Sequence, residues 1–249
     1  MQDKVYGLIG YPLGHSFSKS YFNEKFNIES IHAEYVNFEI ENINDLRSIV
    51  QNQSICGLNV TIPHKRAVID MLDILDDVAK EVGAVNVIKF IREGNKTILK
   101  GYNTDVVGVT NSISKMIKSN HKKALILGTG GVSKAIDYSL KKLGIDTLFV
   151  SRTHKDGIIT YDMLNKEIMS EYTIIVNASP VGMHPNIDNA PLIPYEFITD
   201  KHVIFDTIYN PAETKLMKLA ANKGAAVKNG LEMLEGQAIA AWNIWNDKQ

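Results

Sequence analysis

Cysteine is almost absent from this 249-residue sequence, in which Cys56 is the single thiol. One cysteine excludes an internal disulfide framework, and we expect the reducing setting of the cytoplasm. Cys56 lies inside an apolar run, where we expect a small buried hydrophobic residue. The seven histidines are scattered without His-x-x-x-His or His-x-His spacing, so the sequence predicts no metal site.

Long apolar runs and an excess of charge are missing as well. No apolar stretch approaches the ~20 residues that a membrane-spanning helix needs, and the first residues do not have the pattern of a signal peptide. The 27 Lys and Arg residues nearly balance the 28 Asp and Glu residues. We therefore expect neither membrane association nor nucleic-acid binding. A hydrophobic content of 45% is typical of a globular protein with a full core.

Short apolar segments alternate with segments of helical periodicity, a pattern typical of an α/β fold. The pattern restarts after the polar stretch 118–123, which predicts a second domain beginning near residue 106. The predicted strands cover 5–10, 31–38, 58–62, 84–91, 97–100, 124–127, 147–150, 174–176, 203–205 and 225–228. The predicted helices cover 17–26, 43–50, 64–72, 76–82, 105–119, 132–143, 212–222 and 231–245.

Polar side chains alternate along the predicted strand that ends before Pro63. Asn59 and Thr61 point to one face, because side chains alternate along a strand. Pro63 lacks an N–H and ends the ladder. Lys65 follows at the carboxyl end of the strand, where open α/β sheets bind ligands. A lysine after a proline is, taken alone, more often a solvated surface residue, so the rest of the chain decides between the two interpretations.

Three further polar clusters occur in the first half of the chain. Ser16 and Ser18 lie at a helix start, a place suited to a carboxylate or phosphate, whereas N-capping explains one hydroxyl better than two. Asn86 begins an apolar strand and is either a structural hydrogen-bonding residue or a ligand contact. Asp105 alone is best interpreted as a helix cap. Near Lys65, however, it would form a pair that donates and recovers a proton beside a carbonyl.

A glycine-rich turn joins a predicted strand to a predicted helix. Its pattern, Gly128-x-Gly130-Gly131-x-Ser133, is that of a dinucleotide-binding fingerprint, with serine at the third small position. Gly128 allows the tight turn, and Gly130 lets the backbone approach a pyrophosphate at the helix N-terminus. A purely structural glycine turn is the alternative.

The next strand ends in Ser151-Arg152-Thr153 and lacks the carboxylate that would bind a ribose 2′-hydroxyl in an NAD site. A guanidinium can pair with a 2′-phosphate through two hydrogen bonds. Arg152 alone would be interpreted as an exposed loop residue. Together with the glycine turn it favours NADP.

Nine motifs, taken in order, resemble shikimate dehydrogenase along nearly the full length of the chain. They are GYPLGHSFS (10–18), NVTIPHK (59–65), GAVN (83–86), NTD (103–105), GTGG (128–131), SRT (151–153), NASPVGM (177–183), DTIYNP (206–211) and GLEMLEGQA (230–238).

The resemblance implies an α/β fold of two domains. Residues 1–105 with 230–249 would form an open α/β substrate-binding domain, to which the C-terminal helix returns, and residues 106–229 a Rossmann-type NADP-binding domain. The implied activity is the reversible NADPH-dependent reduction of 3-dehydroshikimate to shikimate, on the pathway to chorismate and aromatic amino acids. The implied partner is this small-molecule substrate, bound by a monomer or homodimer.

The resemblance also implies site residues. Lys65, as proton carrier, and Asp105 would form the catalytic pair. The implied substrate-binding residues are Ser16, Ser18, Asn59, Thr61, Lys65, Asn86, Asp105, Tyr209 and Gln237. The implied cofactor-binding residues are Gly128, Thr129, Gly130, Gly131, Val132, Ser151, Arg152, Thr153, Thr207, Gly230 and Asp77.

The chain departs from the family pattern at three positions. Lys19 stands where the family usually has proline, Phe22 where it has histidine, and Ser151 where it has asparagine. Two other functions stay open. One is a quinate/shikimate dehydrogenase of broader specificity that uses NAD, against which Arg152 speaks. The other is a non-catalytic dinucleotide-binding module on the same fold, against which Lys65 and Asp105 speak.

Overall fold

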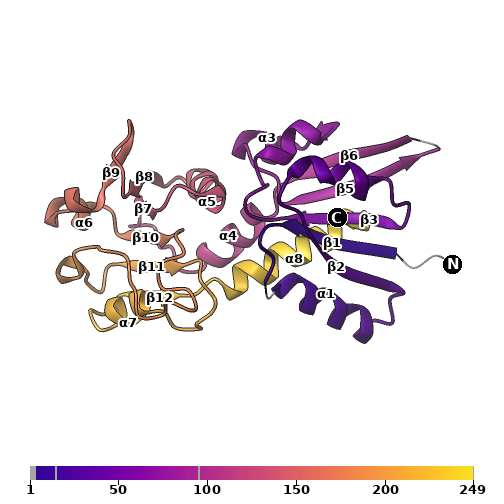
Figure 1. Cartoon of the computed structure of the whole chain (residues 1–249). Helices are drawn as coiled ribbons and strands as arrows, with labels where there is room; N and C mark the ends of the chain where they lie inside the picture. Colours follow the sequence, from indigo (N-terminus) through magenta and orange to yellow (C-terminus); the bar gives the residue numbers. More distant parts are fainter. Residues whose placement is uncertain (1–3, 15, 95, 249) are drawn as a thin grey trace. The chain divides into compact units, whose positions relative to one another are not determined.

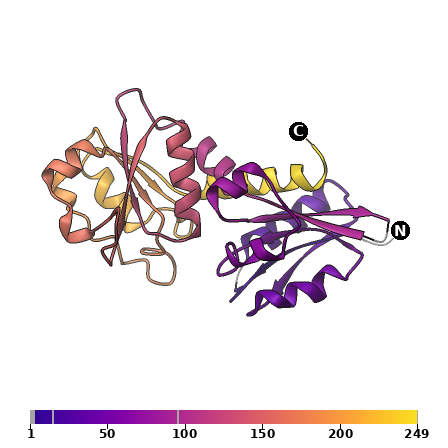
Figure 2. The same cartoon turned by 90° about the horizontal axis from the view of Figure 1, so that it is seen from above.

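The computed structural model describes residues 4–14, 16–94 and 96–248, and the chain divides into two compact units (Figure 1; Figure 2). Unit 1 contains the described residues up to Thr104 and those from Ala238 onward, and unit 2 spans Asp105–Gln237. The helix α8 (Leu231–Trp245) belongs to both units. The predicted boundary at residue 230 precedes this helix, whereas the two units divide inside it. Among the described residues, no helix is both long and apolar enough to cross a membrane.

Unit 1 is built on a mixed six-stranded sheet in the order β2-β1-β3-β5-β6-β4. β1, β2 and β3 are parallel, so their carboxyl ends meet at one edge, whereas β5 is antiparallel to β3 and β6 to β5. β4 runs parallel to β6. The strand bounds are β1 (Lys4–Gly10), β2 (Ala33–Glu39), β3 (Ile55–Val60), β4 (Ile74–Leu75), β5 (Val87–Glu93) and β6 (Lys96–Tyr102).

Two apolar cores lie on opposite faces of this sheet. One face is covered by α1 (Phe17–Ile28) and the C-terminal part of α8, drawn in yellow in Figure 1, and its core is aromatic. This core includes Tyr6, Phe22, Tyr35, Trp242 and Trp245. The opposite face packs against α2 (Leu46–Val50), the 3-10 helix η2 (Ala67–Met71) and α3 (Asp77–Val82).

Unit 2 is built on a six-stranded sheet in which all paired strands are parallel. The spatial order is β12-β11-β10-β7-β8-β9. Numbered from β7 as the first strand, this is the order 3-2-1-4-5-6 of a dinucleotide-binding doubly wound sheet. The strand bounds are β7 (Lys123–Leu127), β8 (Asp146–Ser151), β9 (Ile158–Thr160), β10 (Ile174–Asn177), β11 (Val203–Asp206) and β12 (Ala226–Lys228).

Helices cover both faces of the second sheet. One core joins α4 (Asp105–Ile113), α5 (Gly131–Lys142) and Met233 to the strands, and the other joins α6 (Lys166–Glu171) and α7 (Lys215–Ala221). The predicted α/β class with a Rossmann-type second domain is therefore confirmed. The chain order changes direction between β7 and β10, so the carboxyl ends of these strands form the expected ligand edge.

Three predicted helices were wrong in extent. The helix expected over 64–72 is η2 alone, because the His64 ring is buried and its Nε2 lies 2.7 Å from the Ile40 carbonyl oxygen. The helix expected to continue from 105 to 119 ends at Ile113, where a turn begins with a hydrogen bond from Met116 N to Ile113 O. The helix expected from 212 begins at Lys215, after its N-cap Thr214.

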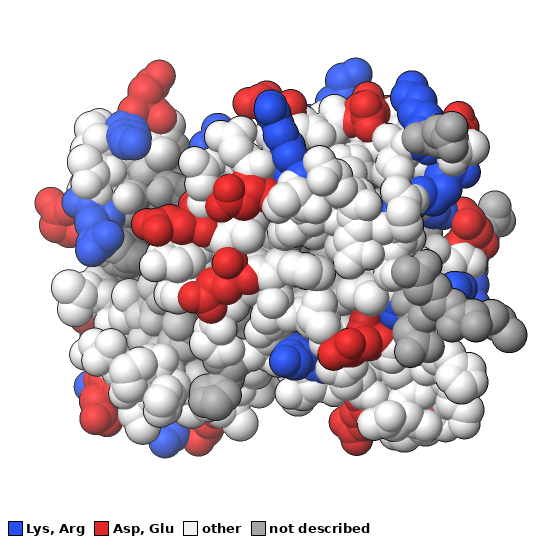
Figure 3. Space-filling model, turned by 45° about the vertical axis from the view of Figure 1, so that its right-hand side comes forward, with Lys and Arg blue, Asp and Glu red and all other residues white. Residues whose placement is uncertain are grey.

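Further elements were not predicted, and all are short. They are β4, β9 and α6, each of six residues or fewer. Predicted strand 58–62 likewise ends at Val60. On the face drawn in Figure 3, acidic and basic side chains are interspersed over a largely uncharged surface, in keeping with the net charge of −1.

Candidate active site

The carboxyl end of β3 carries the central polar cluster of unit 1. Asn59, 4% exposed, donates from Nδ2 to the backbone oxygen of Asn86 at 3.3 Å, and Val60 N donates to the same oxygen at 2.9 Å. Farther along, Val85 N donates to the backbone oxygen of Lys65 at 2.8 Å. The structure thus brings the segments of Asn59, Lys65 and Asn86 side by side. Thr61, next after the strand, is half-buried.

The side chain of Asn86 has structural partners. Its Oδ1 accepts the Thr104 N–H at 2.7 Å and its Nδ2 donates to Thr104 Oγ1 at 3.0 Å. Asn103 Nδ2 donates to the Ala84 backbone oxygen at 2.9 Å. These bonds fix the residues immediately before Asp105, so Asn86 acts at least as a structural hydrogen-bonding residue, and a ligand contact there stays a prediction.

The two serines at the start of α1 have different roles. Ser16 is the N-cap, with its Oγ accepting the Lys19 N–H at 3.3 Å. Ser18 is the second residue of the helix. Burial raises the pKa of the Tyr35 hydroxyl, and a hydrogen bond with the Ser18 side chain acts in the opposite direction. N-capping therefore accounts for the Ser16 hydroxyl but not for the Ser18 hydroxyl. His15 of this motif lies outside the described residues.

Lys65 and Asp105 fall in different units. Lys65 is half-buried in unit 1, whereas Asp105 is buried at the first position of α4 in unit 2. Their pairing stays a prediction. Asp77, exposed in the first turn of α3, likewise belongs to unit 1, while the other residues predicted to bind the cofactor belong to unit 2.

The glycine turn has the geometry expected of a phosphate-binding loop. Gly128 has a φ of +116°, and a Cβ there would lie 3.0 Å from the backbone oxygen of Ala178, so the tight turn requires glycine. A Cβ at Gly130 would meet no atom within 4 Å, so packing within the protein does not require glycine there. Gly130 is the N-cap of the twelve-residue α5, whose first N–H groups and dipole favour an anion.

The remaining turn residues differ in exposure. Thr129 is exposed, while Gly131 and Val132 are half-buried at the helix start. Ser133 is fully buried and donates from Oγ to the backbone oxygen of Gly130 at 2.6 Å. Ser133 therefore packs and hydrogen-bonds the turn, which is how a serine replaces the third small residue of the fingerprint.

Arg152 lies at the same edge of the sheet as the glycine turn. β8 pairs with β7 in the register Leu127↔Val150, and Ser151, Arg152 and Thr153 follow directly. Arg152 and Thr153 are exposed. Burial raises the pKa of Tyr161, and the positive charge of Arg152 acts in the opposite direction. Arg152 therefore follows the strand next to the one that leads into the glycine turn, and its side chain is exposed.

A buried carboxylate links the loops that follow β10 and β11. Asp206 is fully buried and accepts hydrogen bonds from Asn177 Nδ2 at 3.0 Å, Ile208 N at 3.1 Å and Thr214 Oγ1 at 2.7 Å. Burial raises its pKa, and these three donors oppose that shift. The carboxylate thus fixes the NASPVGM and DTIYNP loops to each other and to the start of α7.

The third loop at this edge contains Gly230. Its N–H donates to the Ile208 oxygen at 3.0 Å, and a Cβ at this position would lie only 2.1 Å from the backbone oxygen of Thr207. The structure therefore brings the backbones of Thr207 and Gly230 together, and their contact with a cofactor stays a prediction. Tyr209, in the loop after β11, is 37% exposed. Gln237, on α8, is buried and donates from Nε2 to Leu234 O at 3.0 Å.

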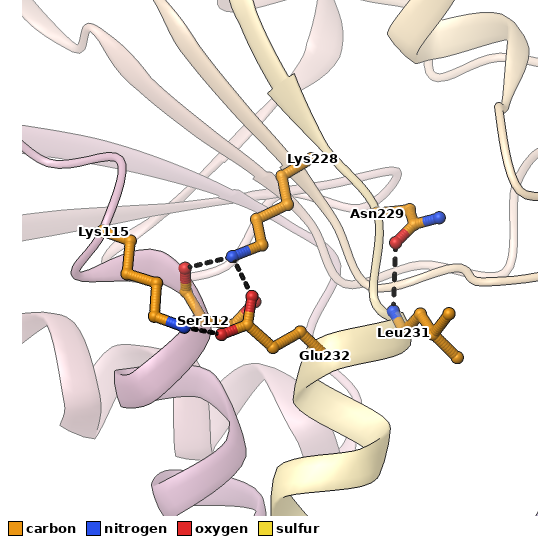
Figure 4. Close-up of polar contacts among 6 residues, drawn as sticks. All are labelled: Ser112, Lys115, Lys228, Asn229, Leu231 and Glu232. Atoms are coloured by element: carbon orange, nitrogen blue, oxygen red, sulfur yellow. Dashed lines mark hydrogen bonds and ion pairs between the residues drawn. The ribbon is translucent and has the colours of Figure 1, made fainter.

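Figure 4 shows the hydrogen bonds and ion pairs at the start of α8, directly after Gly230. Asn229 Oδ1 accepts the Leu231 N–H at 3.2 Å. Glu232 forms ion pairs with both Lys115 and Lys228, and Lys228 also donates to the Ser112 backbone oxygen at 2.9 Å. Hydrogen bonds from the two lysines lower the pKa of Glu232. These contacts join α4, β12 and α8 within unit 2.

Tyr35 was missed by the sequence reasoning. It is fully buried on β2, and its hydroxyl donates to Asn59 Oδ1 at 2.7 Å. Asn37, two residues farther along the same face, has a buried Oδ1 without a hydrogen-bond partner among the described residues. The signal was the alternation of this strand, which puts a phenol and an amide on the face that Asn59 also occupies.

Unit 2 has the strand order of a dinucleotide-binding sheet, with a glycine turn after its first strand. Unit 1 is a second α/β unit that carries a polar cluster. Together these features define a two-domain dinucleotide-dependent enzyme. The family model described as the shikimate dehydrogenase substrate binding domain matches residues 8–88. An NADP(+) shikimate dehydrogenase from Methanosphaera stadtmanae is 38% identical, over 98% of this chain and 92% of its own length. The chain belongs to the shikimate dehydrogenase family.

Solved structures agree with this assignment. A shikimate dehydrogenase crystallised in complex with NADP+ has 34% identity and a TM-score of 0.86, over 98% of this chain and 90% of the other. The enzyme from Aquifex aeolicus has 36% identity and a TM-score of 0.85, over 99% of this chain and 93% of the other. The similarity therefore covers both units rather than the sheet alone.

Proposed function

We propose that the chain catalyses the reversible NADPH-dependent reduction of 3-dehydroshikimate to shikimate, a step towards chorismate and the aromatic amino acids. The observation that carries this proposal is 38% identity, over 98% of the chain, to an NADP(+) shikimate dehydrogenase. In this proposal unit 1 binds the substrate and unit 2 binds the cofactor. A monomer or homodimer stays a prediction.

The proposed substrate site gathers hydroxyl, amide and ammonium groups. Ser16 and Ser18 hold the substrate carboxylate, and the polar side chains beyond them bind the ring hydroxyls or the carboxylate edge. These further residues are Asn59, Thr61, Asn86, Asp105, Tyr209 and Gln237. Support comes from the cluster at the end of β3, where the Asn59, Lys65 and Asn86 segments are hydrogen-bonded together.

The proton chemistry falls to Lys65. Its ammonium donates a proton to the carbonyl oxygen as that oxygen becomes a hydroxyl, and recovers it in the reverse direction. Asp105 binds the neighbouring hydroxyl and keeps the ammonium charged and oriented. Asp105 is buried, and the hydrogen bonds of Asn86 to Thr104 hold the backbone before it, which supports a fixed position for its carboxylate.

The residues of unit 2 fit an NADP molecule. The open space at Gly130 and the N-terminus of α5 suit the pyrophosphate, which Gly128, Thr129, Gly131 and Val132 would surround. Arg152 and Thr153, with Ser151, would bind the 2′-phosphate. Thr207 and Gly230 would contact the nicotinamide half, and Asp77 would add a contact from unit 1. When bound, the reduced cofactor supplies the hydride.

The direct test is absorbance at the reduced-nicotinamide band with shikimate and NADP+ or NAD+. We expect shikimate-dependent formation of NADPH at a rate well above that of NADH. Binding of NADP+ without any turnover of shikimate would contradict the proposal and favour a non-catalytic dinucleotide-binding module. Faster oxidation of quinate than of shikimate would favour the broader quinate/shikimate dehydrogenase.

Arg152 provides the test of cofactor choice. Arg152→Ala removes the guanidinium that we assign to the 2′-phosphate, so KM should rise for NADP+ by about 10- to 100-fold and change little for NAD+. Lys166→Ala, an exposed cation in the same unit, is the matched control and should change neither value. Equal losses with both cofactors would disprove the assignment of Arg152.

A further inference from the structure

The hydroxyl of Tyr35 occupies a fixed position inside unit 1. The ring is fully buried and stacks on Phe22, with centroids 4.9 Å apart and an angle of 13° between the planes. Asn23 of α1 forms two hydrogen bonds of 2.9 Å with the backbone of Tyr35: its Nδ2 donates to the Tyr35 oxygen, and its Oδ1 accepts the Tyr35 N–H. The stacked Phe22 ring and these two hydrogen bonds hold the Tyr35 side chain in place.

This one hydroxyl joins two elements that carry proposed substrate residues. It donates to Asn59 Oδ1, on β3, at 2.7 Å. It also shares a hydrogen bond with the side chain of Ser18, on α1. Neither residue is near Tyr35 in the sequence, and only the packing of α1 onto the sheet brings the three side chains together.

Two hydrogen bonds, to the Asn86 backbone oxygen and from the Tyr35 hydroxyl, define the orientation of the Asn59 amide. The backbone oxygen of Asn86 can only accept a hydrogen bond, so Nδ2 must face it, and the distance is 3.3 Å. Oδ1 then faces Tyr35, whose hydroxyl donates to it. One N–H of Asn59 remains, and no acceptor for it occurs among the residues that the structure describes.

We propose that Tyr35 is a positioning residue for substrate recognition, which holds Asn59 so that its amide presents a hydrogen-bond donor to the ligand. The site then selects an acceptor oxygen, such as that of a ring hydroxyl or a carboxylate, at this point. The inference rests on the proposed function, because it takes Asn59 as a substrate-binding residue.

The variant Tyr35→Phe removes one oxygen atom and keeps the stacked ring. The Asn59 amide loses the partner of its Oδ1 and is held only by the 3.3 Å hydrogen bond from its Nδ2, so we expect KM for shikimate to rise about tenfold. The KM for NADP+ and the value of kcat should each change by less than about twofold, since neither the proposed cofactor residues nor Lys65 contact Tyr35.

Tyr6→Phe is the matched control. Tyr6 pairs with Tyr35 in the register of β1 and β2, is 1% exposed, and has its own hydrogen-bond partner, Asn246. Both variants delete a buried hydroxyl and should lower the melting temperature to a similar extent. Only Tyr35→Phe should change KM for shikimate. An equal change in Tyr6→Phe would show that the effect is structural and would overturn the proposal.

A double-mutant cycle separates this proposal from the proposed function. Asn59→Ala should raise KM for shikimate, and adding Tyr35→Phe should raise it no further, because Tyr35 acts through Asn59. The double variant also leaves no buried acceptor unpaired, so it keeps the test available if Tyr35→Phe folds poorly. Additive effects would overturn the role of Tyr35. An unchanged KM in Asn59→Ala would instead refute Asn59 as a substrate-binding residue.

Discussion

Lys65 is the one amine among the residues that we propose to contact the substrate. Its position depends on backbone contacts, since its carbonyl oxygen accepts the Val85 N–H at 2.8 Å while its side chain extends from a turn after Pro63. The sequence predicted its neighbourhood because Asn59, Thr61 and Lys65 follow one strand. The pairing with Asp105 involves two units, so it is the part of the site that stays a prediction.

Lys65→Ala tests this residue directly. We expect kcat to fall by about 10²- to 10⁴-fold, with a smaller change in KM, because proton transfer is lost while most of the binding groups remain. Lys96→Ala, an exposed lysine in the same unit, is the control and should leave both constants unchanged. Near-normal kcat in Lys65→Ala would remove Lys65 from its proposed role.

At the scale of elements, two glycines serve opposite purposes. A Cβ on Gly57 in β3 would lie 2.3 Å from the ring of Trp245, and that ring is held by a hydrogen bond from Nε1 to Ile88 O at 3.1 Å. A Cβ on Gly130 would meet nothing. Gly57 is therefore required by packing of α8 on the sheet, and Gly130 leaves space for a ligand.

Alanine at each glycine should separate these two requirements. Gly57→Ala should destabilise the protein by about 1–3 kcal/mol, as overpacking does. Gly130→Ala should cost no more than about 1 kcal/mol, the value of a changed helix cap, and should weaken NADP+ binding. Chemical denaturation and a binding titration measure the two effects. Normal NADP+ affinity in Gly130→Ala would contradict the assignment of the turn.

The Asp206 contacts between β10, β11 and α7 give the stability a pH dependence. Burial raises the pKa of Asp206 in the folded protein above the value of about 3.9 in the unfolded chain. Between these two pKa values the folded state binds more protons than the unfolded state. The contribution of Asp206 to the free energy of unfolding is therefore present below about pH 3.9 and is lost as the pH rises through the raised pKa.

Asp206→Asn removes this titration and keeps an acceptor for Asn177 and Ile208. We expect the free energy of unfolding of the unsubstituted protein, relative to that of the variant, to decrease as the pH rises above about 4. Urea denaturation at a series of pH values measures the difference between the two proteins. A difference that increases with pH would show that the donors around the carboxylate outweigh its burial.

At the scale of the whole molecule, α8 is the element shared by both units. Its first half carries Met233 in a core of unit 2, and its second half carries Ala238, Ala241, Trp242 and Trp245 in the aromatic core of unit 1. One helix thus contributes to two hydrophobic cores, which makes the folding of unit 1 depend on the last residues of the chain.

Ending the chain after Gln237 should unfold unit 1. The two tryptophans alone are worth about 3–5 kcal/mol each when truncated, against a total stability of about 5–15 kcal/mol for a domain. Ending it after Trp245 is the control, since this removes the exposed Asp247 but no buried aromatic residue. Circular dichroism and limited proteolysis measure the outcome. Protection of unit 1 without residues 238–249 would contradict this dependence.

The sequence by itself determined the α/β class, the restart of the pattern at the second unit, the glycine turn and the arginine after the next strand. These features are local, because periodicity and turn chemistry involve residues that are close in the chain. The tertiary structure decided the strand order, the shortening of the helix expected over 64–72 and the contacts of buried polar groups. Tyr35 with Asn59, and Asp206 with Asn177 and Thr214, are brought together by packing and register, which no local pattern encodes.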